Sequence, residues 1–119
     1  MFSHALEEAA QKHIEGRKCM KELKFKEAVV LLEEALQIRS MYVDVPPFVC
    51  IVDIATLHLD IGRALQALNL GDAMNHFTQA WSMFRDYLGC DHPLTQDAHQ
   101  ECILIAARRS QYSVSAVAA

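Results

Sequence analysis

Four residues near the C-terminal end carry side chains that zinc prefers. Cys90, His92, His99 and Cys102 form the pattern C-x-H-x6-H-x2-C, and zinc accepts two thiolates and two imidazoles in tetrahedral geometry. The spacing is not that of a common zinc finger, and Cys102 also fits the apolar face of a predicted helix. Zinc binding is therefore an alternative to the main prediction, which includes no metal and no other cofactor.

A cysteine and a histidine could also act as a nucleophile and its base, but such a pair needs an orienting third group and donors for the oxyanion. The sequence contains no glycine-rich phosphate loop, no GxSxG and no HExxH motif. Its paired carboxylates fall on predicted exposed helix faces: Glu7, Glu8, Glu33 and Glu34. The sequence therefore predicts a protein that is not an enzyme.

A basic stripe is the clearest candidate for a binding site. His13, Arg17 and Lys21 are four residues apart, so they share one face of a helix. On a chain whose net charge is −4, such a stripe favours a ligand with Asp or Glu, held by charge-assisted hydrogen bonds. The alternative is a solvated face whose charges only maintain solubility.

Composition and charge narrow the class of protein. Of 119 residues, 52% are hydrophobic and 22% are charged, which is typical of a chain that folds. Only four Gly and three Pro are present, so long helices are favoured over turn-rich β structure. The negative net charge gives no general attraction to nucleic acid. We expect one small helical domain that does not bind nucleic acid.

The sequence contains no segment that is typical of a membrane span or of a secretory signal peptide. The apolar stretch Phe48–Ile54 is followed by charged residues and is shorter than the roughly 18 apolar residues that a membrane span needs. The N-terminal residues are too polar for a secretory signal peptide. The four cysteines form no CxxC pair and are interpreted as reduced core thiols. A cytoplasmic protein without membrane insertion is predicted.

Hydrophobic periodicity and helix-breaking residues predict five helices in one domain, residues 1–112, followed by a flexible tail, 113–119. The third helix is apolar on nearly every side, so we expect it in the centre. The predicted parts are a first hairpin at about 3–42, with helices 3–23 and 25–41; a second hairpin at about 48–88, with helices 48–69 and 73–88; and a capping helix at about 93–110.

The chain nearly repeats itself at an offset of 45 residues. Ala28, Leu32, Ala35 and Leu36 recur as Ala73, Phe77, Ala80 and Trp81. His13 recurs as His58, whereas Gly62 is displaced by one place from the position that Gly16 predicts. A repeat of this size, with small residues at fixed places, indicates a stack of helical hairpins. The register of Trp81 and Phe84 predicts that both lie in the core and do not form a binding hot spot.

Gly16, Phe25, Glu27, Ala28, Leu32 and Ala35 stand at the spacings of a tetratricopeptide repeat. The segment LGCDHPLT, residues 88–95, is similar to the junction of kinesin-light-chain-type repeats. Over about residues 5–109 the chain therefore resembles this family. The resemblance implies an all-α fold, a right-handed stack of antiparallel helical hairpins with about five helices. The first junction departs from the pattern, because residues 43–47 contain neither glycine nor histidine.

In this family the first helix of each hairpin lines a concave face that holds a peptide. The resemblance implies a non-enzymatic adaptor or scaffold that binds a peptide or protein segment, and the basic stripe favours an acidic one. The alternative is a self-associating domain of a larger protein, for instance a homodimer. The implied partner-binding positions are His13, Arg17, Lys21, His58, Gln66, Gln100 and Arg108.

Overall fold

The computed structural model describes residues 2–42 and 51–118, and the side chains of residues 4–42 and 51–108. Over this range all regular structure is α-helical, and the five predicted helices are confirmed. Their bounds are Phe2–Lys21 (α1), Phe25–Ser40 (α2), Ile51–Ala67 (α3), Ala73–Leu88 (α4) and Pro93–Ala118 (α5). The predicted start of the third helix, residues 48–50, lies outside the described residues.

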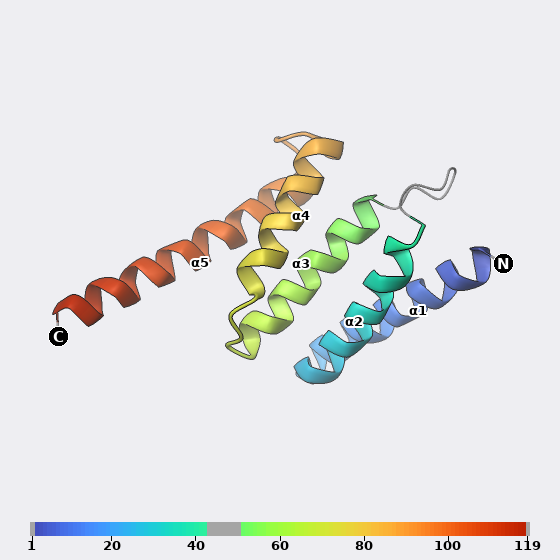
Figure 1. The fold of residues 1–119 in the computed structure, drawn as a ribbon, viewed down its shortest axis with the longest axis horizontal. Coiled ribbons are helices and arrows are strands. Elements are labelled where there is room, and N and C mark those ends of the chain that lie inside the picture. The colour runs from blue at the N-terminus through green and yellow to red at the C-terminus, as the bar shows by residue number, and fades with distance from the viewer. Residues whose placement is uncertain (1, 43–50, 119) are drawn as a thin grey trace.

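Each helix packs antiparallel against the next one along the chain (Figure 1). The helices α1 and α2 form one hairpin, and α3 and α4 form a second. The helix α3 lies between α2 and α4 and is the most buried of the five. Its central position follows from a sequence that is apolar on nearly every side.

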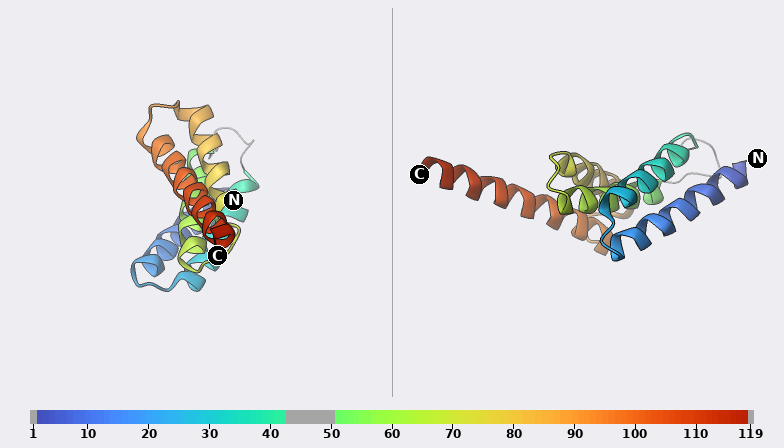
Figure 2. Two further views of the ribbon diagram at one scale, coloured as in Figure 1. Left: turned by 90° about the vertical axis from the view of Figure 1, so that its left-hand side faces the viewer. Right: turned by 90° about the horizontal axis from the view of Figure 1, so that it is seen from below.

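The body is elongated because α5 extends past the other four helices (Figure 2). The radius of gyration is 15.6 Å, whereas about 13.5 Å is typical of a compact chain of this length. The predicted end of the capping helix near residue 110 is corrected, since α5 continues to Ala118, whereas the flexibility of the tail at 113–119 stays a prediction. No Gly or Pro follows Pro93, so the sequence contains no residue that would stop the helix there.

The repeated residues form the core of both hairpins. Small residues let the paired helices approach closely, and one bulky residue fills the space between them. Each of the first three repeated pairs is 5% exposed or less: Ala28 and Ala73, Leu32 and Phe77, Ala35 and Ala80. The fourth pair, Leu36 and Trp81, is partly buried against this core.

The bulky residue of each second helix packs on a glycine of the first helix. A Cβ atom on Gly16 would lie 2.8 Å from Leu32 Cγ, and one on Gly62 would lie 2.6 Å from Phe77 Cε1. Both glycines therefore have the same packing role, although they are 46 and not 45 residues apart.

The turns that end α1 and α3 show the same offset of 46. Leu23 and Asn69 both adopt left-handed backbone conformations, with φ of 64° and 57°. In both turns the next amide bonds to a carbonyl five residues back, as in a Schellman cap: Lys24 to Cys19 at 2.8 Å, and Leu70 to Leu65 at 2.9 Å. First helices repeat every 46 residues and second helices every 45, because Ala28 lies five residues after Leu23, whereas Ala73 lies only four residues after Asn69.

This shift corrects one prediction. The first-helix offset of 46 aligns His13 with Leu59, and His58 with Lys12. His13 and His58 are therefore not equivalent positions, and their recurrence at an offset of 45 is a coincidence.

The close glycine contact gives a test of the packing. We expect Gly62→Ala to lower the free energy of unfolding by about 1–3 kcal/mol, because the added methyl group overpacks a fully buried ring. Helix propensity alone would change it by about 1 kcal/mol in the opposite direction. Urea denaturation measures the difference. The control is Gly71→Ala, which meets no atom within 4 Å, and equal stability of the two variants would contradict the packing role.

Candidate partner-binding surface

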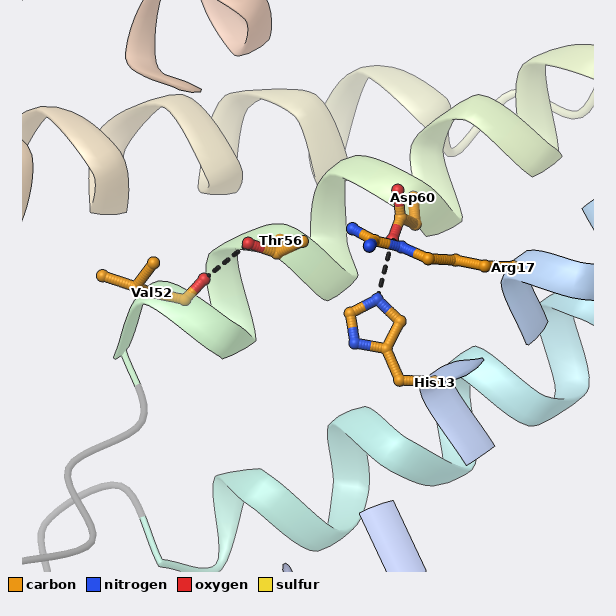
Figure 3. A network of polar contacts seen from close by, with 5 residues as sticks. All are labelled: His13, Arg17, Val52, Thr56 and Asp60. Atoms are coloured by element: carbon orange, nitrogen blue, oxygen red, sulfur yellow. Dashed lines mark hydrogen bonds and ion pairs between the residues drawn. The ribbon is translucent and has the colours of Figure 1, made fainter. Parts of the chain in front are cut away.

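A buried carboxylate joins the first helices of the two hairpins. Asp60 on α3 accepts hydrogen bonds from two α1 side chains, with 2.8 Å from His13 Nε2 and 2.9 Å from Arg17 Nε to the same oxygen, Oδ2 (Figure 3). The Asp60 side chain is only 8% exposed, whereas that of Arg17 is 53% exposed. Because α1 touches α3 at few places, this contact is a main link between them.

The partners of Asp60 keep it ionised. Burial by itself would raise the pKa of the Asp60 carboxyl, but the hydrogen bonds from His13 and Arg17 and the charge of Arg17 outweigh burial and hold the pKa below its usual value of 3.8. A buried carboxylate that loses such partners is left with an uncompensated charge. His13 and Arg17 therefore serve as partners of a buried group, although the Arg17 side chain itself is half exposed.

The predicted basic stripe is corrected by this geometry. Two of its three members face Asp60, and only Lys21 extends freely from the exposed surface of α1. Helical spacing placed the three residues correctly on one face. It gave no information about Asp60, which is 43 residues from Arg17 and approaches it only when α1 packs beside α3.

His58 also lies inside the molecule and not on a binding surface. It is 7% exposed, and its Nδ1 lies 2.9 Å from Nδ1 of His76 on α4. Only one of two nitrogens at this distance can carry a proton, so the two rings cannot both be charged without breaking the contact. Burial first, and the neighbouring ring second, lower the pKa of His58 from 6.5 to about 4. Burial also lowers the pKa of His76, against the charges of Glu33 and Asp72.

Two of the predicted binding residues meet in one pocket. Gln66 at the end of α3 and Arg108 on α5 line a pocket of about 280 Å³ beside the α3–α4 turn. Among the described residues, no ion pair involves Arg108. Its guanidinium is exposed to solvent and is available to a carboxylate. Gln100 is exposed on α5 and does not line this pocket.

The remaining lining residues are ones that the sequence did not indicate. They add an amide and several apolar side chains: Asn69, Leu70, Gly71, Ala73, Met74 and Ile105. The turn sequence Asn-Leu-Gly-Asp predicts a helix end, but not that α5 returns beside it. The pocket therefore combines hydrogen-bond donors with an apolar wall, a mixture suited to a side chain with a polar end.

A second pocket, of about 300 Å³, lies at the α1–α2 turn and contains none of the predicted binding residues. Its wall contains two lysines, Lys24 and Lys26, and one carboxylate, Glu27, and Lys24 already pairs with Glu22 at 3.3 Å. Unlike the pocket with Arg108, it therefore contains a carboxylate that would repel an acidic ligand.

The proposed zinc ligands are not brought together. His99 stacks on Trp81 with ring centroids 4.9 Å apart, and His92 Nδ1 accepts the Leu94 amide at 3.1 Å. Among the side chains of residues 4–42 and 51–108, no three from His, Cys, Asp or Glu are placed to hold a metal ion. Cys90 is exposed, contrary to the expectation of a core thiol, while Cys19 and Cys102 are partly buried and Cys50 lies outside the described residues.

Trp81 and Phe84 on α4 have different environments. Phe84 is fully buried, as predicted. Trp81 is only half-buried, because one ring contact is with the exposed His99 and the guanidinium of Arg85 lies 5.0 Å from its centroid. The stack joins α4 to α5.

None of the described helices is long and apolar enough to cross a bilayer. Comparison with known protein families, curated proteins and solved structures finds no match to this chain. The resemblance to tetratricopeptide repeats therefore stays a prediction from the sequence, and function must be argued from the geometry of the surface.

The internal role of Arg17 leads to a stability prediction. We expect Arg17→Ala to lower the free energy of unfolding by about 1–2 kcal/mol, because Asp60 loses a charged partner while Arg17 itself is half exposed. Lys21→Ala, one helical turn away, is the matched control and should change it by less than about 0.5 kcal/mol. Urea denaturation of both variants provides the measurement. Equal losses would show that the contact with Asp60 does not stabilise the fold.

The histidine pair predicts a loss of stability in mild acid. The unfolded chain takes up a proton at His58 near pH 6.5, but the folded chain only near pH 4, so the free energy of unfolding falls as the pH decreases between these values. The depressed pKa of Asp60 acts in a lower range, below about 4.

Urea midpoints at several pH values from 7 to 4 measure this effect. The double variant His58→Leu/His76→Leu should show a smaller loss in this range, and the exposed His4→Gln variant should keep the loss of the parent protein. An unchanged pH dependence in the double variant would disprove the role of the pair.

Proposed function

We propose that the chain is a hairpin-repeat module, similar to tetratricopeptide repeat domains, that binds a segment of another protein without catalysing a reaction. The segment contributes a carboxylate, which is held at the pocket between the end of α3 and α5. The observation that carries the proposal is the meeting of Gln66 and Arg108, from two different helices, in one pocket with an apolar wall.

The chemistry of the pocket supports an acidic segment. A guanidinium binds a carboxylate with charge-assisted hydrogen bonds, and the amides of Gln66 and Asn69 can donate further ones. The side chains of Met74 and Ile105 provide contact for an aliphatic neighbour. Because the pocket is small and open, affinity would depend on a few such anchors and not on area.

Several other polar residues of the first helices already have a partner within the chain. His13 and Arg17 have an internal partner in Asp60, and Arg63 on α3 lies 3.9 Å from Glu101 on α5. Two repeated hairpins with equivalent glycine contacts support a stack of the tetratricopeptide kind. Arg108 and Lys21 are the predicted basic positions that stay available to a partner.

Peptide selection followed by titration tests the proposal. A displayed library of random peptides is selected on the protein, and we expect enrichment of sequences with Asp or Glu next to an aliphatic residue. Anisotropy titration of a selected peptide should show that Arg108→Glu raises the dissociation constant about tenfold or more, because one charge-assisted contact becomes a repulsion.

Lys21→Glu is the matched control, since it makes the same charge change on an exposed position of α1. Its dissociation constant should stay within about twofold of the parent value. A loss of binding in Lys21→Glu but not in Arg108→Glu would place the acidic segment along α1 and refute the pocket. Selected peptides without acidic residues would refute the carboxylate.

A further inference from the structure

The outer side of α5 is an uncovered apolar surface. Ala98 and Ile105 face α4 and are buried, but their neighbours on the opposite side are open to solvent. Ile103 is 48% exposed and Leu104 is 41% exposed, and Ala107 lies one turn beyond Ile103. A helix that is apolar on both sides is normally covered on both.

The first helices of the two hairpins, α1 and α3, are covered by side chains of their own hairpin. The glycines of α1 and α3 receive Leu32 and Phe77 from the second helix of their own hairpin. The helix α5 packs mainly on α4, and its C-terminal part projects beyond the other helices (Figure 2). A single projecting helix gains little stability without tertiary contacts.

One acidic and one basic residue lie beside this surface, at nearly equal distances from Ile103. Asp97 lies six residues before Ile103, and Arg108 lies five residues after it. Both are exposed, and neither takes part in an ion pair among the described residues. Both also lie on the same flank of α5 as Leu104, because these positions fall within about 40° of one another at 100° per residue.

We propose that a second copy of this chain covers the surface, with the two α5 helices packed antiparallel about a twofold axis near Ile103. In this arrangement Ile103 and Leu104 of both copies meet at the centre, and Ala107 lies about one turn away from it on each helix. Asp97 of one copy then lies beside Arg108 of the other, and the symmetry forms this contact twice. An interface between identical surfaces of this kind is the commonest form of homodimer.

The charge pattern is what selects a second copy over an unrelated helix. An amphipathic helix of another protein would need only an apolar face and would place no constraint on Asp97 and Arg108. Two exposed ion pairs contribute modestly and a single helix pair buries little area, so we expect a dimer in the micromolar range, roughly 1–100 μM.

Sedimentation equilibrium at several protein concentrations, with reductant so that the exposed Cys90 cannot cross-link, tests the dimer. The parent protein should change from monomer to dimer as concentration rises. Ile103→Ser should weaken the association about tenfold or more, whereas Ile14→Ser, at an apolar position on α1 that is 61% exposed, should leave it unchanged. A monomer throughout, or equal effects of the two variants, would overturn the proposal.

Charge exchange tests the antiparallel arrangement itself. Asp97→Arg and Arg108→Asp should each weaken the dimer about tenfold, because each replaces two attractions by two repulsions. The double variant Asp97→Arg/Arg108→Asp restores opposite charges across the axis and should recover the parent association. Additive losses in the double variant would rule out this pairing.

The dimer does not depend on the peptide proposal, although Arg108 borders both surfaces. Sedimentation is done without peptide, and peptide titration can be repeated on Ile103→Ser, whose pocket is intact. Failure of the dimer with peptide binding retained, or the reverse, separates the two proposals.

Discussion

One buried carboxylate ties α1 directly to the second hairpin. The two hairpins pack on each other mainly through α2 and α3, whereas α1 meets α3 at few points and reaches it with His13 and Arg17 at Asp60. A charged group in a site that is 8% exposed is costly unless its partners are correctly placed. Shifting α1 by one turn would leave Asp60 without them.

The polar residues of the first helices fall into two groups: those with a partner inside the chain, and those that are free to contact another molecule. Asp60 uses His13 and Arg17, and Arg63 lies near Glu101, so successive first helices are linked by charge. His58 is used by His76. Lys21 on α1 stays available, and so do Gln66 and Arg108, which line a pocket in which no described carboxylate pairs with the guanidinium. The site is thus defined by the absence of internal partners, which sequence spacing does not reveal.

Local patterns predicted most of the fold. Periodicity, Gly71 and Pro93 located the helix boundaries within a few residues, and the first residue of α4 was correct. The repeat identified the core of both hairpins, since Ala28 and Phe77 are fully buried. The end of α5 was wrong because a polar-apolar mixture without Gly or Pro is compatible with a helix. These features depend on residues that are close to one another in the sequence, so the local pattern is enough to predict them.

The site was predicted less well because it depends on contacts between distant residues. A single offset of 45 hid the separate period of 46 in the first helices, which made His13 and His58 look equivalent. The pairing of His13 with Asp60 spans 47 residues and depends on how α1 lies across α3. The pocket likewise exists only because α5 returns past the α3–α4 turn.

The helix α5 differs from α1 and α3 in its exposed side chains, and this difference explains why both proposed surfaces include it. On α1 and α3 the bulky residue that fills the glycine site comes from the same chain, although Ile14 on α1 is still 61% exposed. On α5 the apolar residues Ile103 and Leu104 and the charged residues Asp97 and Arg108 all lack such a partner among the described residues. Exposed apolar surface is costly in water, and unpaired charge beside it selects which surface can cover it. A helix with both features is therefore better suited to contacts with other molecules than α1 or α3.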